Sequence, residues 1–419
     1  METSAHDSPA PSAVYEIAGQ RFEIGSRGFA EAIAEAHAAH QRPRCMCLRS
    51  GDGQGVEMYV ARLGDGYIVK RMPDTGSHHA PDCPSYEPPP DFSGLGQVLG
   101  SAITEDPATG ETTLKLDFPL TKMPGRSQMP PAGGDSDSVA SDGTRLSLRG
   151  LLHYLWDQAG FNRWSPAMEG KRSWPVIRKF LLQAAESKTT KTIRLLESLY
   201  VPEAFVIERR DEIAERRMAL LRKTIPEHGS GPRQLVVAIA EVKEILPARY
   251  GHKLVFKHVP DLPFMLTADL HARMLKRFEP ELQMWQSYED THLIAVCTFG
   301  VGTTGIASVE ELALMDVTAG WIPYDSAFEK TLIDELALQR RRFVKGLRYQ
   351  LSPTRPLASV VLSDTEPDPT AMYILPLTAS AEYRAAQSEL IANSKLPSWT
   401  WTAGERLMPA PPPRRARMT

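Results

Sequence analysis

The stretch from Arg44 to Glu87, RCMCLRSGDGQGVEMYVARLGDGYIVKRMPDTGSHHAPDCPSYE, organises the chain around it. The motifs Cys-x-Cys and His-x-x-x-Cys at its two ends each place two side chains that bind transition metals within one turn. Three thiolates and one imidazole are a ligand set typical of closed, structural zinc sites. The stretch therefore predicts a structural Zn²⁺ site formed by Cys45, Cys47, His79 and Cys83.

A predicted hairpin lies between these two motifs. Residues 56–63 alternate in polarity, Gly64-Asp65-Gly66 is typical of a turn, and residues 67–72 form the returning strand. Because a hairpin brings its ends together, we expect the two pairs of ligands to meet. His78 competes with His79 as the fourth ligand, and the spacing to Cys83 favours His79. The alternative is that these are ordinary thiols of a reduced cytosolic chain.

Composition places the chain among soluble globular proteins with two or three domains. Its 419 residues are 42% hydrophobic and 24% charged, with a net charge of -3. The N-terminus lacks the pattern of a signal peptide, and no apolar run approaches the ~20 residues of a membrane span. Four cysteines in so long a chain do not make a disulfide framework. We expect a cytoplasmic protein with no membrane association.

The predicted fold class is α+β. Residues 1–12 are predicted to be disordered, and residues 13–120 to form a small zinc-binding N-terminal domain that is rich in β-strands. Residues 121–144 are rich in Pro, Gly, Ser and Asp, which predicts a flexible linker. Residues 145–230 are predicted to be helical, including a third helix over 189–202. Residues 231–405 are predicted as a larger α+β domain of helices and a mixed sheet, and 406–419 as a disordered basic tail.

One glycine motif invites a cofactor interpretation. Gly300-Val-Gly302-Thr-Thr-Gly305 follows a predicted strand and matches G-x-G-x-x-G. Dinucleotide binding needs a helix directly after this motif, whereas the following residues favour a hairpin partner. A phosphate-binding loop with G-x-x-x-x-G-K-[ST], the zinc-protease motif H-E-x-x-H and the nucleophile elbow G-x-S-x-G are all missing from the sequence.

The last third of the chain has the element order of a restriction-endonuclease-like fold. Such enzymes bind Mg²⁺ through strand-borne carboxylates. Here the expected Asp position falls near Ser359, and the E-x-K strand has Met372-Tyr373-Ile374 instead. We therefore expect this fold, if present, to be catalytically degenerate. The alternative is a divergent metal-dependent nuclease that uses Asp364 with Glu366 or Glu382.

A basic and aromatic cluster precedes that region. Its cations could contact a nucleic-acid backbone while its rings stack on bases. The alternative is a helix end whose arginines complement the dipole and pair with Asp334 and Glu335. An acidic protein partner would suit the same residues. The candidate nucleic-acid-binding residues are Arg340, Arg341, Arg342, Lys345, Arg348 and Tyr349.

Several segments together resemble a bacterial family, domain of unknown function 1173. They are the three clustered cysteines, RMPDTGSHHAPDCPSYEP, FVKGLRY and PLASVVLSDT. Members of that family are often encoded on plasmids and integrative conjugative elements, so the resemblance implies a mobile-element setting and no particular activity. From these observations we expect a non-enzymatic accessory protein that binds DNA, RNA or a DNA-processing protein. A protein–protein adaptor is the remaining alternative.

Overall fold

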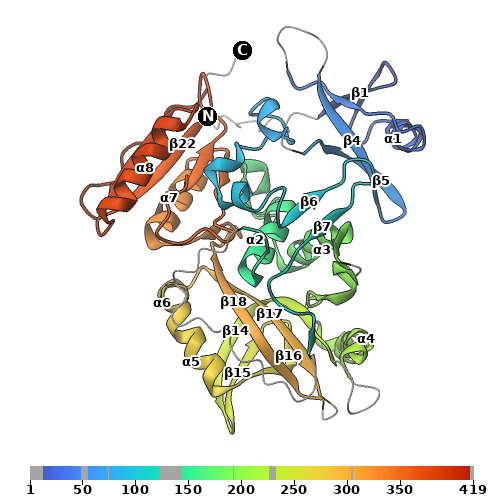
Figure 1. Ribbon diagram of the computed structural model, residues 1–419, viewed down its shortest axis with the longest axis vertical. Helices are drawn as coiled ribbons and strands as arrows, with labels where there is room; N and C mark the ends of the chain where they lie inside the picture. Colours follow the sequence, from blue (N-terminus) through green and yellow to red (C-terminus); the bar gives the residue numbers. More distant parts are fainter. Residues whose placement is uncertain are drawn as a thin grey trace, which may run out of the picture.

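The computed structural model describes residues 13–48, 55–73, 75–122, 143–191, 193–225, 233–302 and 305–415 (Figure 1). The predicted disordered N-terminus and residues 123–142 of the predicted linker lie outside the described residues. The fold is α+β, as predicted. Three lobes surround the central helix α2 (Leu148–Gln158): an N-terminal sheet, a barrel and a C-terminal sheet. No helix in the described part of the chain has the length and apolar character to cross a membrane.

The N-terminal sheet has five strands in the order β2-β1-β3-β4-β5. The hairpin predicted from the alternating residues is confirmed, because its two strands pair antiparallel from Met58–Arg71 to Leu63–Gly66. Helix α1 (Phe29–Ala38) packs on this sheet through Ile33 and Ala36. The strands are β1 (Val14–Ile17), β2 (Gln20–Glu23), β3 (Arg44–Cys45), β4 (Val56–Leu63) and β5 (Gly66–Arg71).

A second sheet crosses the predicted domain boundary. Its order is β11-β10-β7-β6, and β7 pairs in parallel with β10, which lies beyond the predicted linker. Residues 98–118 also share one hydrophobic cluster with α2 and the barrel. The segments before and after residues 121–144 therefore have a common core. The strands are β6 (Ile103–Glu105), β7 (Thr112–Leu114), β10 (Lys188–Thr190) and β11 (Ile193–Arg194).

The helical region contains fewer helices than predicted. Helices α2, α3 (Trp174–Glu186) and α4 (Arg210–Leu221) lie within residues 145–230, the region predicted to be helical. The third predicted helix, over 189–202, is wrong: this segment forms β10, β11, a 3₁₀ turn (Leu195–Ser198) and β12 (Leu199–Tyr200). Pairing with β7 and β14, both remote in sequence, supplies its backbone hydrogen bonds instead.

Five long strands close into a barrel. The first three, β14, β15 and β16, form an antiparallel meander; β16 then pairs in parallel with β18, and β17 pairs antiparallel with both β18 and β14. Helices α5 and α6 connect β16 to β17. The elements are β14 (Val236–Ala248), β15 (Gly251–Phe256), β16 (Val259–Leu266), α5 (Ala268–Arg277), α6 (Glu279–Ser287), β17 (His292–Val301) and β18 (Ala307–Val317).

Aromatic rings fill the barrel interior. The rings of Phe256, Phe264 and Phe299 are fully buried, and the two contacts between them are edge-to-face with centroids 4.7 and 4.8 Å apart. Such pairs stabilise a core beyond the area they bury. Two short strands extend the barrel sheet, β12 beside β14 and β19 (Pro323–Tyr324) beside β18. A separate ribbon pairs β8 (Thr121–Lys122) with β13 (Arg233–Gln234).

The glycine motif lies in a hairpin of this barrel. Strand β17 contains Gly300 and β18 returns antiparallel, so the predicted hairpin is confirmed. Residues 303–304 of the motif lie outside the described residues.

The C-terminal sheet has the order β23-β22-β21-β20-β9, and its core is separate from that of the barrel. The predicted single domain over 231–405 thus contains two sheets. Helices α7 (Ala327–Leu338) and α8 (Ala381–Asn393) begin at serine N-caps, whose hydroxyls accept backbone N–H bonds. The strands are β9 (Arg163–Trp164), β20 (Phe343–Lys345), β21 (Val360–Leu362), β22 (Thr370–Pro376) and β23 (Ser398–Ala403).

The C-terminal segment packs on this sheet up to residue 415, although the sequence predicted disorder from 406. The indole N–H of Trp399 donates to the Ala410 carbonyl (3.1 Å), and Nη1 of Arg341 donates to the Pro412 carbonyl (2.7 Å). Proline-rich chain has carbonyls without neighbouring N–H partners, so it satisfies such donors readily. Residues 416–419 lie outside the described residues.

A buried carboxyl in the barrel gives a prediction for stability. Asp316 on β18 is fully buried and neither oxygen has a hydrogen-bond partner among the described residues. Burial raises the pKa of Asp316 to about 8, and the nearby Glu281 and Asp325 add to the rise. In the unfolded chain the pKa is about 4. Between these values the unfolded state releases its proton first, so this group makes stability fall as pH rises from about 4 to 8.

We therefore expect Asp316→Asn to increase the free energy of unfolding by roughly 2–5 kcal/mol at pH 8 and by little at pH 4.5. Urea denaturation at both pH values measures the difference. The exposed Asp269 on α5 provides a control, because Asp269→Asn should change stability little at either pH. An equal change at both pH values in Asp316→Asn would contradict the buried, protonated carboxyl.

Candidate metal centre

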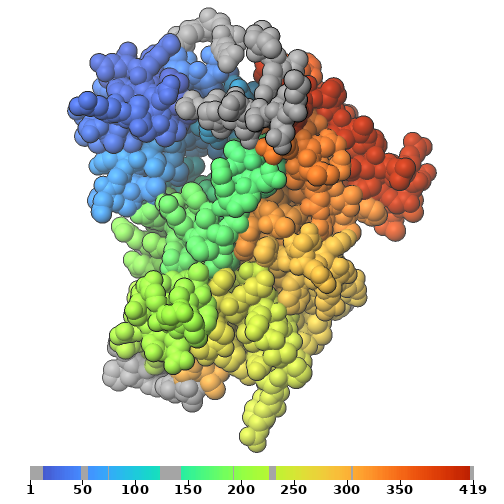
Figure 2. Space-filling model, turned by 180° about the vertical axis from the view of Figure 1, so that it is seen from behind, coloured from blue at the N-terminus to red at the C-terminus, as the bar shows by residue number. Residues whose placement is uncertain are grey.

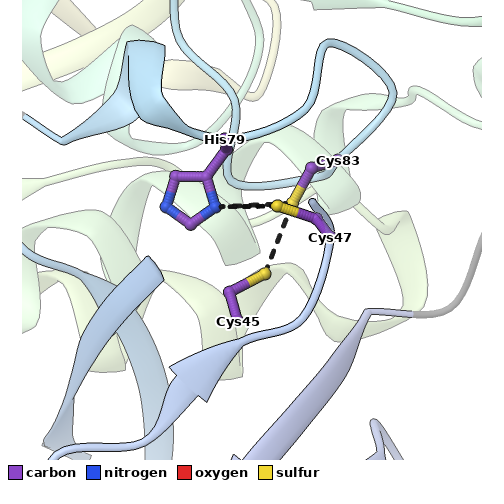
Figure 3. A group of neighbouring side chains, drawn as sticks. All are labelled: Cys45, Cys47, His79 and Cys83. Carbon is purple, nitrogen blue, oxygen red and sulfur yellow. Dashed lines mark hydrogen bonds between the residues drawn. The ribbon is translucent and has the colours of Figure 1, made fainter. Parts of the chain in front are cut away.

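Four side chains converge where the N-terminal sheet meets the loop that follows β5 (Figure 3). Cys45 ends β3, paired with Tyr15 of β1 and Val56 of β4, so the sheet fixes its position. Cys47 lies two residues later. A 3₁₀ turn (Gly76–His78) delivers His79, and a turn closed by the Cys83 N–H and the Ala80 carbonyl (2.8 Å) positions the last thiol.

The distances between these side chains fit a single tetrahedral ion. One ligand atom from each of the four lies within 4.8 Å of the others. Sγ of Cys45 is 3.7 Å from Sγ of Cys83, and Nδ1 of His79 is 3.5 Å from Sγ of Cys47 and 3.7 Å from Sγ of Cys83. Zinc bonds of ~2.3 Å to sulfur and ~2.0 Å to nitrogen give tetrahedral edges of about 3.5–3.8 Å. The group could therefore hold a metal ion, and its donors suit zinc.

The surroundings favour a closed site. Cys45, His79 and Cys83 are buried, and Cys47 is half-buried. Backbone N–H groups of Ala80 and Ser85 donate to the sulfurs of Cys47 and Cys83, each at 3.4 Å, as is common around metal-bound thiolates. Between the two histidines considered as fourth ligand, the structure selects His79, because His78 is exposed and outside the group.

The protonation of the thiols also fits a cation site. Hydrogen bonds from Cys45, Cys83 and His79 hold the pKa of Cys47 far below its usual range. The Cys47 thiolate in turn raises the pKa of Cys45, together with Cys83 and burial. A divalent cation at this position would favour deprotonation of all three thiols.

Ion pairs fasten this site to the rest of the protein. Glu87, four residues after Cys83, pairs with Arg71 at the end of β5 and with Arg163 of β9 (2.8 Å). Arg163 also donates to the Tyr86 carbonyl. The loop that supplies two of the ligands therefore contacts both the N-terminal sheet and the C-terminal sheet.

The predicted basic cluster lies mostly in the interior. Arg341 is 3% exposed and makes a two-point ion pair with Asp364 (2.8 and 3.1 Å). Lys345 is 1% exposed and pairs with Glu329 (3.3 Å). Tyr349 is buried, and its backbone N–H donates to Nδ1 of His153 (2.9 Å). These three side chains are buried in this conformation, and binding of nucleic acid by the cluster stays a prediction.

The other three members are more accessible but do not form a shared surface with them. Arg340 is exposed and pairs with Glu169 (2.9 Å), and Arg342 is half-buried. Nε of Arg348 donates to Asp325 (3.1 Å). The sequence predicted Asp334 and Glu335 as the acidic partners of the cluster. The ion pairs described here instead join the cluster to Glu169, to Asp325 and Glu329, and to Asp364.

Asp325, which the sequence did not single out, is the centre of that pairing. Its two oxygens contact Nη2 of Arg149 on α2 (2.8 Å), Nε of Arg348 (3.1 Å) and Nζ of Lys345 (3.9 Å). The three cations come from α2 and from the segment after α7. We call these four residues, together with Glu329, the Asp325 hub; it connects α2 to the C-terminal sheet.

The carboxylates considered for a nuclease do not form a metal site. Asp364 accepts from Arg341 and from the backbone N–H of Arg342 (2.9 Å), so its oxygens are engaged. Glu382 lies at the exposed start of α8. Among the described residues, the group around Cys45 is the one set of three or more ligand side chains close enough to share an ion.

Comparison with known proteins gives one match. A family model described as "Protein of unknown function (DUF1173)" matches residues 15–404, which include all four candidate ligands. No curated protein and no solved structure matches the chain.

Proposed function

The chain belongs to the DUF1173 family of proteins of unknown function, and from this premise we propose that it is a non-enzymatic accessory protein that binds nucleic acid through its barrel. The N-terminal ligand group holds a structural zinc ion in this proposal. We also propose that it acts in a bacterial mobile element, because the family resemblance of the sequence implies that setting.

The connectivity of the barrel is the observation that carries the proposal. The first three strands form a meander, and helices connect the third strand to the fourth. The third strand pairs in parallel with the fifth, and the fourth strand closes onto the first. This connectivity is the topology of the OB-fold. OB-folds bind oligonucleotides on the face of strands two and three and with the loops between strands one and two and between four and five. Here the first of these loops is residues 249–250, and the second follows β17 at Val301 and precedes β18 at Ala307.

The metal group supports a structural role for the ion. Four protein ligands fill a tetrahedral sphere and leave no position for a substrate or a reactive water. The nearby Glu87 is held by two arginines and Asp82 is exposed, so neither is placed as a general base. Zinc would supply folding free energy by joining β3 to the loop before Glu87.

Two assays on the full-length, zinc-loaded protein test the proposal. Fluorescence anisotropy should show binding of a labelled single-stranded oligonucleotide longer than the roughly 4–16 nucleotides that one OB-fold covers. Affinity should fall with salt, because each neutralised phosphate releases counterions. Supercoiled plasmid incubated with Mg²⁺ or Mn²⁺ should remain intact.

Each assay also has an outcome that would contradict the proposal. Nicking that disappears in Asp364→Asn would establish the divergent nuclease instead. An absence of oligonucleotide binding at low salt would remove the nucleic-acid role and leave the protein–protein adaptor.

A further inference from the structure

A pocket of about 310 Å³ opens at one end of the barrel, beside the turn between β14 and β15. Its walls are the end of β16, the start of β18, the β8–β13 ribbon and the turn itself. The polar lining residues are Lys122, Arg233, Tyr250, Thr267, Ser308 and Glu310. The two loops through which OB-folds contact their ligands begin at this same end, so the pocket lies where a bound strand would pass.

Arg233 supplies an unused donor at this pocket. Its Nε and Nη2 are buried and have no hydrogen-bond partner among the described residues. A buried guanidinium nitrogen without an acceptor is costly, so a rotation of the Arg233 side chain toward the pocket would let a ligand oxygen supply the missing hydrogen bond. Arg233 also packs on Gly300, where an added Cβ would lie 2.6 Å from Nε. The first glycine of the G-x-G-x-x-G motif therefore makes room for this arginine.

The other charged groups leave the pocket with a net positive charge. Lys122 and Glu310 form an ion pair (2.7 Å) and offset each other, whereas no carboxylate in the described part of the chain pairs with Arg233. The planar set of donors of an arginine matches the oxygens of a phosphate group, as it does those of a carboxylate. The Ser308 and Thr267 hydroxyls add neutral hydrogen-bonding groups to the same lining.

The β14–β15 turn extends the pocket outward. This hairpin protrudes from the body at the lower end of the molecule (Figure 2). Tyr250 at its tip is 78% exposed although it also lines the pocket, and the Arg249 guanidinium lies 5.3 Å from the centre of its ring. An exposed ring beside an arginine is a platform on which a base can stack while its phosphate is neutralised.

We propose that this pocket binds a phosphate group of a single-stranded nucleic acid through Arg233, with the adjacent base on Tyr250. This inference rests on the proposed nucleic-acid function and names its site. Free nucleotides and inorganic phosphate carry the same phosphate chemistry, so the test includes them separately.

The test is oligonucleotide anisotropy on four full-length variants, with zinc content and thermal unfolding checked for each. Arg233→Gln removes the donor, Gly300→Ala displaces it without changing charge, and Tyr250→Ala removes the platform at an exposed position. Arg21→Gln on β2 is the matched control, since it removes one exposed cation from another lobe.

We expect Arg233→Gln and Gly300→Ala to weaken binding roughly tenfold, the size of one charged hydrogen bond. Arg233→Gln should reduce the slope of log affinity against log salt by about 0.7, the value for one phosphate of a single strand. Tyr250→Ala should weaken binding with the slope unchanged, because stacking neutralises no phosphate. Arg21→Gln should bind like the wild type.

Failure of the proposed pocket can be distinguished from failure of the proposed function. If the wild type binds the oligonucleotide and all four variants bind equally, the pocket is not the site and the proposed function stands. If the wild type binds no oligonucleotide, the proposed function fails. Titration of inorganic phosphate and of a mononucleotide then shows which ligand the pocket binds. If Arg233→Gln abolishes binding of phosphate, the pocket is a site for a free anion, and the proposal that it binds a nucleic-acid strand is overturned.

Discussion

A Cys47→Ser variant is expected to lose most of its bound zinc and to unfold at least ~3 kcal/mol more easily. Structural zinc contributes ~10–16 kcal/mol of binding free energy in small zinc peptides, and three remaining ligands retain only part of it. The loss should spread beyond the N-terminal sheet, because the loop carrying His79 and Cys83 continues directly to the Glu87–Arg163 ion pair. Elemental analysis and chemical denaturation measure the two effects.

The remaining cysteine provides the control. Cys297 is buried on β17, far along the chain from the ligand group. Cys297→Ala should keep one zinc per chain, so any cost to its stability is a packing effect. Full zinc occupancy in a variant with Cys45, Cys47 and Cys83 all changed to serine would eliminate the proposed site.

Asp325→Asn is expected to lower the free energy of unfolding by about 3–5 kcal/mol at neutral pH, because it leaves buried cations without their counter-charge. Burial of Asp325 opposes its ionisation, but Lys345, Arg149 and Arg348 outweigh burial and lower its pKa. A carboxyl with a lowered pKa stabilises the fold above its unfolded pKa of about 4, and this contribution is lost as pH falls below that value.

The difference between wild type and Asp325→Asn should therefore be largest near pH 7 and shrink in acid. Urea denaturation from pH 3 to pH 7 would follow it. Arg340→Gln is the comparison, since its pair with Glu169 is exposed on both sides and such pairs contribute ~1 kcal/mol or less. Equal costs in the two variants would mean that the Asp325 hub contributes no more than a surface pair.

The metal group could be predicted from sequence because its determinants are local. The spacing of Cys45, Cys47, His79 and Cys83 and the alternation of the hairpin between them lie within one stretch, and the structure brings the four together as expected. The choice between two adjacent histidines could not be made with the same certainty, because both spacings allow a turn. Only the burial of His79 decides it.

The basic cluster shows the opposite case. A run of cations suggests a surface only while their partners are unknown, and here the partners are remote: Asp325 lies 23 residues before Arg348, and Asp364 lies 23 residues after Arg341. A mixed sheet was likewise predicted for residues 231–405, where the barrel strands lie. Their closure was not, because the pairing of β14 with β17 depends on register across some 50 intervening residues.

Lys122 and Arg233 escaped the sequence analysis for a related reason. Each is a single cation in a segment that the composition assigns to a linker or a boundary, and neither belongs to a charged run. The pairing of β8 with β13 places them side by side at the pocket. The glycine motif was the available signal, but its first glycine serves the arginine rather than a cofactor loop.

The parallel pairing of β7 with β10 also sets an order of events on the ribosome. Thr112 must wait for Lys188, its partner 76 residues later, and at typical elongation rates of about 5–20 residues per second the delay is roughly 4–15 s. The cysteines and the hairpin between them emerge within one continuous stretch and can capture zinc during that interval. Until β10 arrives, β7 has one open edge, which is the arrangement that invites pairing with another nascent chain.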